Sequence, residues 1–183
     1  MIDITEEMRE YSKKRTTEHI ERVDSIGELL GFDYSQHDET KFSNELMEAY
    51  ILIDNSFRKD LDPPVEYTQE MADASFQHIT WEPHHPEFWD ENLTQSKQVG
   101  RDIPDSDQIA NAENMDLNSM IEMICDWCAM SIELNGDPIA WAKENIPRKW
   151  KFTEKQLVVI YSILDYTWVE VLQRESKEWS SPI

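Results

Sequence analysis

The histidines of this chain, together with two aspartates, are the residues best suited to chemistry. The sequence contains five histidines, and one of them forms the pair His37-Asp38. Imidazole nitrogens and carboxylate oxygens are ligands for divalent metals such as manganese, iron, cobalt and zinc. The other candidate ligands are distributed along the chain, at His19, His78, His84, His85 and Asp126. The sequence therefore predicts a metal site wherever the fold brings these side chains together.

The first candidate ligand lies in a long predicted helix. The pattern predicts a helix over residues 5–30, in which Thr5 is the N-cap and Gly31 is the C-terminal stop. His19 lies on the same apolar stripe as Val23, at helical spacing, so its ring is expected to point inward. A histidine in such a position is also compatible with a purely structural role in the core.

Two later helices carry further candidates. A helix predicted over residues 68–81 places His78 on its inward face. A strongly apolar helix predicted over residues 117–135 contains Asp126, with Glu122 one turn earlier. Burial of a carboxylate is unfavourable unless another group pairs with it. Asp126 is therefore expected to bind a metal or to form a salt bridge, if it does not simply face solvent.

Further helices complete an all-α pattern. One is predicted over residues 46–57, another begins at Asp137-Pro138, and the last follows a capping box formed by Thr153 and Gln156. Glycine is scarce and long alternations of valine or isoleucine are few, so strands are not favoured. The expected fold is an all-α helical bundle.

The segment over residues 82–116 has no sustained helical or strand period. It contains the run Pro83-His84-His85-Pro86, in which prolines flank two adjacent histidines. Long segments of this kind are often lids or binding loops. We therefore expect a long active-site loop in which at least one of the two histidines has a functional role.

Length and charge limit the classes of function. The chain has 183 residues, a length that suits a single domain over residues 1–183. Its formal net charge of −21 disfavours long nucleic acids and anionic membranes as partners. The N-terminal segment is acidic, and no run of about 18 apolar residues occurs, so neither a signal peptide nor a membrane span is expected. Cys125 and Cys128 are expected to be core thiols of a cytoplasmic protein.

The order of the candidate ligands resembles that of the HD superfamily of metal-dependent phosphohydrolases. The matching elements are an early histidine, His37-Asp38 with Lys41 three residues later, a further histidine, an adjacent histidine pair and a late aspartate. The resemblance implies an HD-domain-like helical bundle that hydrolyses a phosphate ester or anhydride, commonly of a nucleotide, with Lys41 near the phosphate. The implied ligands are His19, His37, Asp38 and Asp126 for a first metal, and His78 with His84 or His85 for a second.

Two shorter neighbourhoods, the run from His84 to Trp89 and the residues around Asp126, are also similar to those of a small HD-related family found largely in phages and bacteria. In the branch that hydrolyses cyclic dinucleotides, a Gly-Tyr-Pro signature follows the histidine pair. This chain has Pro86-Glu87-Phe88 in that place, which argues against cyclic dinucleotides as substrates. The related pattern has a glycine two residues after its aspartate. In this chain, that position is occupied by Thr40.

These features predict a metal-dependent phosphohydrolase that acts on a small phosphorylated substrate, with a nucleotide of the dNMP or dNTP type as the expected class. One or two divalent ions per chain, of manganese, iron, cobalt, zinc or magnesium, would supply a water of lowered pKa as the nucleophile. Lys41 would assist at the phosphate, and Glu39 or Glu122 would position the water or orient a ligating histidine. Arg101 or Arg148 would add positive charge.

Two other functions remain open on the sequence alone. HD-type oxygenases hold a di-iron centre with the same fold and ligand set, so an oxidative reaction is one alternative. A non-catalytic nucleotide-binding or host-interaction protein is the other. Trp81, Phe88 or Trp89 could stack on a base, although each is also compatible with a place in the core. The expected location is the cytoplasm, which would be the host cytoplasm if a phage encodes the protein. The sequence also allows a homodimer.

Overall fold

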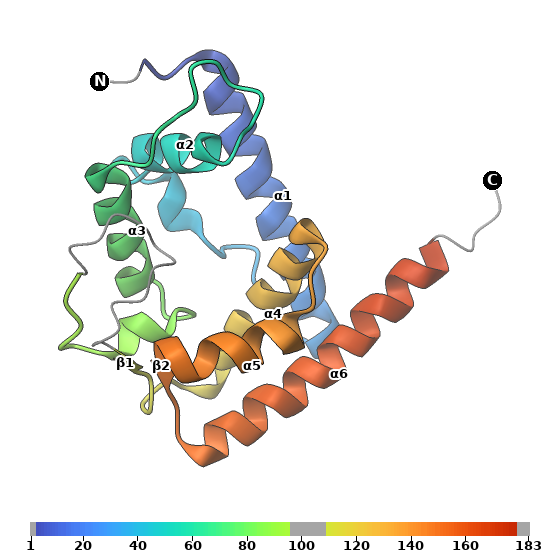
Figure 1. The fold of residues 1–183 in the computed structure, drawn as a ribbon. Helices are drawn as coiled ribbons and strands as arrows, with labels where there is room; N and C mark the ends of the chain where they lie inside the picture. Colours follow the sequence, from blue (N-terminus) through green and yellow to red (C-terminus); the bar gives the residue numbers. More distant parts are fainter. Residues whose placement is uncertain (1–2, 96–108, 179–183) are drawn as a thin grey trace.

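The structure, a computed structural model, describes residues 3–95 and 109–178 of the chain. Helices dominate these residues, and strands form only one short pair (Figure 1), so the fold is all-α as the sequence predicts. The α-helices are α1 (Glu6–Leu30), α2 (Met47–Ser56), α3 (Gln69–Trp81), α4 (Leu117–Leu134), α5 (Pro138–Lys149) and α6 (Glu154–Glu178). The shorter elements are the 3-10 helices η1 (Glu39–Phe42) and η2 (Pro86–Trp89) and the strands β1 (Ala110–Asn111) and β2 (Trp150–Lys151).

Local signals explain where the helices begin and end. The Thr5 hydroxyl accepts a hydrogen bond from the Met8 N–H at the start of α1. Gly31 ends this helix with a left-handed φ of 82°, a conformation that favours glycine. At the start of α5, the Asp137 carboxylate accepts hydrogen bonds from two backbone N–H groups, and Pro138 follows directly. The capping residues predicted for these two helices are therefore confirmed.

The predicted capping box at the start of α6 is also present. The Gln156 N–H donates to the Thr153 hydroxyl at 3.2 Å, and the Gln156 side-chain oxygen accepts from the Thr153 N–H at 2.8 Å. The Gln156 amide group additionally donates to the carbonyls of Ala112 and Met115. This one side chain therefore fixes the start of α6 and the approach of the chain to α4.

The buried apolar residues form two clusters, and α1 contributes to both. Towards its C-terminal end, Val23 packs in a cluster that includes Ile124 of α4 and buried residues of α6. Towards its N-terminal end, Met8 packs in a cluster that includes Met71 of α3 and buried residues of α2. His19 is also buried and lies between Met8 and Val23 along the helix. The first candidate ligand therefore lies where the two clusters meet.

The segment between α3 and α4 differs in part from the prediction of a loop without regular structure. The 3-10 helix η2 directly follows His84-His85. Further along, β1 pairs in parallel with β2, so that Ala110 lies opposite Trp150. Two-residue strands are too short to produce an alternating pattern, which is why the sequence did not reveal them. Residues 96–108, which belong to the predicted active-site loop, lie outside the described part of the chain.

Helix α4 packs against both α1 and α6. Its two cysteines, Cys125 and Cys128, are fully buried and form no disulfide, which confirms them as core thiols. Among the helices that the structure describes, none has both the length and the apolar character needed to cross a bilayer.

Candidate metal centre

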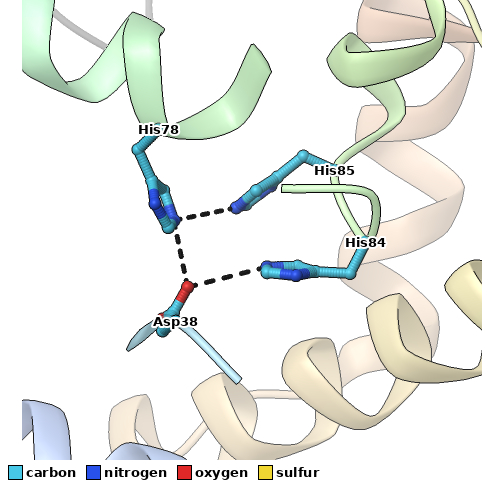
Figure 2. Close-up of side chains that lie close together, drawn as sticks. All are labelled: Asp38, His78, His84 and His85. Atoms are coloured by element: carbon cyan, nitrogen blue, oxygen red, sulfur yellow. Dashed lines mark hydrogen bonds and ion pairs between the residues drawn. The ribbon is translucent and has the colours of Figure 1, made fainter. Parts of the chain in front are cut away.

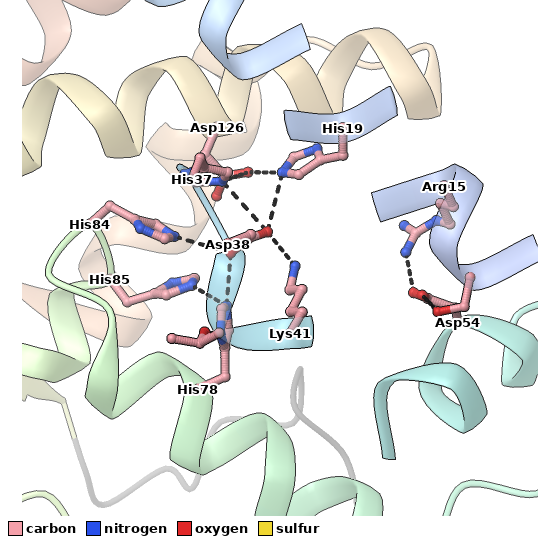
Figure 3. Close-up of polar contacts among 12 residues, drawn as sticks. Arg15, His19, His37, Asp38, Lys41, Asp54, His78, His84, His85 and Asp126 are labelled. Carbon is pink, nitrogen blue, oxygen red and sulfur yellow. Dashed lines mark hydrogen bonds and ion pairs between the residues drawn. The ribbon is translucent and has the colours of Figure 1, made fainter. Parts of the chain in front are cut away.

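All five histidines of the chain are buried and lie around the carboxylate of Asp38, which is itself only 2% exposed (Figure 3). They come from α1, from the turn after α1, from α3 and from the segment before η2. The structure therefore brings together every residue that the sequence proposed as a metal ligand. The side chains fall into two groups on either side of Asp38.

The first donor group consists of His19 on α1, His37 in the turn and Asp126 on α4. The Nε2 atom of His19 lies 3.1 Å from Oδ1 of Asp126, and the Nε2 atom of His37 lies 3.9 Å from the same oxygen. Oδ2 of Asp38 lies 3.6 Å from both of these histidine nitrogens. These residues are the set that the resemblance implied for one metal.

The second donor group consists of His78, His84 and His85, which face the other oxygen of Asp38 (Figure 2). Oδ1 of Asp38 lies 3.0 Å from Nε2 of His78 and 3.6 Å from Nε2 of His84. Nε2 of His85 lies 3.2 Å from Nε2 of His78. The sequence predicts a functional role for at least one of the adjacent histidines, and in the structure both lie beside Asp38.

Asp38 lies between the two donor groups and directs one carboxylate oxygen toward each. Its backbone adopts the left-handed conformation, with φ 60° and ψ 14°, which only a few residue types besides glycine tolerate, aspartate and asparagine among them. Non-glycine residues held in this region are concentrated at functional sites. The Lys41 ammonium, one turn later in η1, contacts Oδ2 of Asp38, in keeping with the predicted place of Lys41 beside the site.

Tyr34 holds the turn that carries His37 and Asp38 against α1. The Tyr34 N–H donates to the Asp24 carboxylate at 2.8 Å, and the Tyr34 carbonyl accepts from the His37 N–H at 2.9 Å. A Cβ atom at Gly27 would lie 2.5 Å from the Tyr34 ring, so this close packing requires glycine. No local pattern in the sequence marks these positioning residues, because only the tertiary contact shows their role.

Side chains behind the histidines determine which ring nitrogens point at Asp38. Oε1 of Glu122 lies 3.0 Å from Nδ1 of His37 and 3.4 Å from Nδ1 of His84. The Thr40 hydroxyl lies 2.9 Å from Nδ1 of His78. Such contacts fix the tautomer and orientation of a histidine so that its other nitrogen, here Nε2, can bind a metal. Glu122 was expected in this role, whereas Thr40 was noted only as a departure from glycine.

Glu82 is a further carboxylate near the site, and the sequence did not predict it. It follows α3 directly and hydrogen-bonds with the Thr40 hydroxyl, and its partial burial raises its pKa. Thr40 therefore connects Glu82 to the ring of His78. No periodic signal marks Glu82, since it lies just beyond the end of the helical pattern.

The two central carboxylates are held in their charged form. Burial raises the pKa of Asp38, but the Lys41 ammonium and the rings of His37 and His78 outweigh burial and hold this pKa well below its ordinary value. Burial acts in the same way on Asp126, and the hydrogen bond and charge of His19 outweigh it, so the pKa is lowered. Both side chains are therefore available as anionic ligands.

The histidines differ in their electrostatic surroundings. Burial, and after it the neighbouring His37, holds the pKa of His84 well below its ordinary value, so this ring is neutral. Burial also lowers the pKa of His37, but Asp38 and the other nearby carboxylates outweigh it, so this pKa is raised. Neutral imidazole and ionised carboxylate are the forms that bind metal.

Several polar atoms of the two donor groups have no hydrogen-bond partner among the described residues. Leaving a buried polar atom unpaired costs roughly 1–3 kcal/mol, and such atoms call for an explanation, such as a bound ion. The atoms concerned include Nδ1 of His19 and the two Nε2 atoms of His37 and His84 that face Asp38. A divalent cation would satisfy the inward-facing nitrogens and the carboxylate oxygens, so the donor set fits a metal.

Other charged residues proposed from the sequence lie away from these contacts. Glu39 is exposed and belongs to none of the described groups of potential ligands. Arg148 is exposed and pairs with Glu144 on α5, with 3.4 Å between nitrogen and oxygen. Arg101 lies outside the described residues.

The aromatic residues proposed to stack on a base lie close to histidines in the sequence, Trp81 after His78, and Phe88 and Trp89 after His85. Trp81 and Phe88 are 48% and 40% exposed, so neither is a core residue. Trp89 is partly buried, and its indole N–H donates to the Pro83 carbonyl at 2.9 Å. This hydrogen bond links Trp89 to the segment that carries His84 and His85.

Comparison with known proteins gives a family without an assigned activity. Residues 8–168 match the model of a family described as "Family of unknown function (DUF5662)". The matched range includes both donor groups, Asp38, Lys41 and Glu122. No curated protein matches the chain, and no solved structure does. Because the match covers most of the sequence, the chain belongs to the family of unknown function DUF5662.

Proposed function

We propose that this protein is a metal-dependent phosphohydrolase that acts on a small phosphate ester or anhydride, with a nucleotide of the dNMP or dNTP type as the expected substrate. The observation that carries the proposal is the position of Asp38. Its two carboxylate oxygens face two separate groups of buried imidazole and carboxylate donors. The two groups, with Asp38 between them, would each hold a metal ion, and enzymes of phosphoryl chemistry commonly use two such ions.

The donor types indicate which metals would bind. Most of the donors are imidazole nitrogens, which suit the later first-row metals, whereas magnesium prefers an octahedron of oxygens. Manganese, iron, cobalt and zinc are therefore favoured over magnesium. When bound, such ions lower the pKa of a coordinated water and neutralise phosphate oxygens.

The residues of the chain would hold and orient the reacting groups. The Lys41 ammonium has three N–H donors, of which one is directed to Oδ2 of Asp38, so others can reach a phosphate oxygen placed beside Asp38. Glu122 and Thr40 keep the ring nitrogens of His37 and His78 directed inward. Burial of the surrounding side chains excludes bulk water, which strengthens these electrostatic interactions.

A turnover assay tests the proposal. Ribo- and deoxynucleotides would be supplied with manganese, cobalt, magnesium or iron, and release of phosphate or pyrophosphate would be measured. We expect release from at least one nucleotide, loss of activity after EDTA treatment, and recovery when the metal is restored. A complete absence of release with every metal would contradict the proposal.

A second function is favoured by one feature of the same site. The five histidines together with Asp38 and Asp126 also suit iron, which imidazole and carboxylate ligands bind well. An oxygenase with two iron ions is therefore the competing proposal. Oxygen consumption by protein that is purified anaerobically and loaded with iron, without any phosphate release, would favour it.

A further inference from the structure

A cavity adjoins the candidate metal centre on the side of α1 and α2. It has a volume of about 120 Å³ and is lined by residues of α1, η1 and α2. Ser12 and Thr16 of α1 belong to its wall. Thr16 precedes His19 by three residues on the same helix, so the two side chains lie on one face of α1. The cavity therefore begins about one helical turn from the first donor group.

The charge of the cavity is opposite to that of the protein as a whole. The chain has 17 basic and 38 acidic residues, yet the lining contains Arg9, Lys13 and Lys41 and no aspartate or glutamate. The nearby carboxylate of Asp54 already accepts from the Ser12 hydroxyl and from Arg15, each at 2.5 Å. Arg9 also contacts Glu48 at 3.8 Å, at an exposed position, and most of the remaining wall is apolar. The charged side chains that line the cavity are nevertheless all basic, which favours an anionic ligand.

Lys41 belongs to both sites. Its side chain lines the cavity, while its ammonium contacts Asp38 between the two donor groups. Lys41 therefore links Asp38 to the cavity wall that carries Arg9 and Lys13. The cavity is smaller than the roughly 300–1,000 Å³ of typical small-molecule sites, so it suits one compact group and not a whole nucleoside.

We propose that this basic cavity binds a second anionic group of the substrate, a phosphate or a carboxylate, while the reacting phosphate lies at the metal centre. The preferred substrate is then a small molecule with two separated anionic groups, or a nucleotide with more than one phosphate. This inference rests on the proposed phosphohydrolase function, because it assigns the reacting phosphate to the metal centre.

Binding of pyrophosphate tests the cavity without requiring turnover. Isothermal titration calorimetry would compare the purified wild-type protein with the double variant Arg9→Gln/Lys13→Gln. The double variant loses two charge-assisted contacts to the anion, so its affinity for pyrophosphate should be weaker by at least roughly tenfold. The control is Lys14→Gln, because Lys14 neighbours Lys13 but does not line the cavity and is 76% exposed. The control should retain wild-type affinity, and thermal unfolding would verify that all variants are folded.

A matched pair of substrates then tests the link to catalysis. Phenyl phosphate has one anionic group, and 4-carboxyphenyl phosphate has a second. With manganese-loaded protein, we expect kcat/KM to be at least about tenfold higher for 4-carboxyphenyl phosphate than for phenyl phosphate. This preference should disappear in Arg9→Gln/Lys13→Gln and remain in Lys14→Gln.

The two proposals can fail separately. If neither compound nor any nucleotide is hydrolysed, the phosphohydrolase function is wrong, and the pyrophosphate titration still decides whether the cavity binds anions. If hydrolysis occurs but the double variant keeps both the substrate preference and the wild-type pyrophosphate affinity, the assignment of the cavity is wrong. Equal weakening in the double variant and in Lys14→Gln would also contradict it, since general surface charge would then explain the effect.

Discussion

The Nε2 atom of His19 lies 3.1 Å from Oδ1 of Asp126, across the contact between α1 and α4. The two residues are far apart in the sequence, and both also lie near His37. This contact joins the N-terminal helix to the late apolar helix at the point where Asp38 approaches. His19 and Asp126 are therefore brought together by the packing of two long helices and not by any local motif.

We expect Asp126→Ala to remove the metal bound by the first donor group. The substitution deletes a carboxylate that is held in its anionic form and faces both His19 and His37. Turnover should fall by more than roughly 100-fold, while circular dichroism shows unchanged helix content. Elemental analysis would measure occupancy, and a variant that keeps full metal content would contradict the assignment.

His84→Gln tests the second donor group. His84 is 1% exposed and neutral, and its Nε2 faces Oδ1 of Asp38. Glutamine fills much of the same space, whereas alanine would leave a cavity in this buried position. We expect loss of one metal per chain with the metal of the first donor group retained. Full occupancy together with wild-type turnover would exclude His84 as a ligand.

Gly27→Ala should disturb the turn that carries His37 and Asp38. The new Cβ would lie 2.5 Å from the Tyr34 ring, and overpacking of this kind destabilises proteins by about 1–3 kcal/mol. The higher helix propensity of alanine opposes this by about 0.5–1 kcal/mol. We therefore expect a net loss in the free energy of unfolding, measured by urea denaturation, and a weaker affinity for metal.

The control for this prediction is Gly136→Ala. A Cβ atom at Gly136 would meet only the Ser131 carbonyl oxygen, at 4.0 Å, so stability and metal affinity should remain near wild type. If both alanine variants behave alike, the contact between Gly27 and Tyr34 does not position the site.

Arg15→Ala should destabilise the protein strongly, because Arg15 joins three helices. Its guanidinium donates to Asp54 of α2 at 2.5 Å and to Glu133 of α4 at 2.9 Å. Asp54 is 3% exposed, and a buried charge without its partner costs about 3–5 kcal/mol. Arg22→Ala is the control, since Arg22 makes one longer contact of 3.4 Å to Glu133. Equal losses in the free energy of unfolding would contradict the special role of Arg15.

Much of the fold follows from local signals in the sequence. Thr5, Asp137 and the Thr153–Gln156 box mark helix starts that the structure confirms. Helical spacing also placed His19 and His78 on buried faces. These features depend on neighbours within a few residues, which is why a single sequence reveals them.

The geometry of the site depends on contacts that no local pattern encodes. The left-handed backbone of Asp38 and the inward direction of both His84 and His85 arise from tertiary packing. The same holds for Thr40, whose hydroxyl faces His78 only because η1 and α3 are adjacent in space. The sequence therefore predicts which residue types gather, and the fold determines how they are oriented.

Metal content, measured by mass spectrometry of purified and reconstituted protein, tests the central claim most directly. The comparison is between wild type, Asp38→Asn and Asp33→Asn. Asparagine tolerates the left-handed backbone of Asp38, so the first substitution changes charge and not fold. Asp33 is exposed in the same turn, where it accepts hydrogen bonds from Ser35, and serves as the control.

We expect about two metal atoms per chain in the wild type and in Asp33→Asn. Asp38→Asn should retain less than half of this content and lose phosphate-releasing activity, because both donor groups share the Asp38 carboxylate. Wild-type protein without stoichiometric metal after reconstitution, or Asp38→Asn with wild-type metal content, would contradict a metal centre built around Asp38.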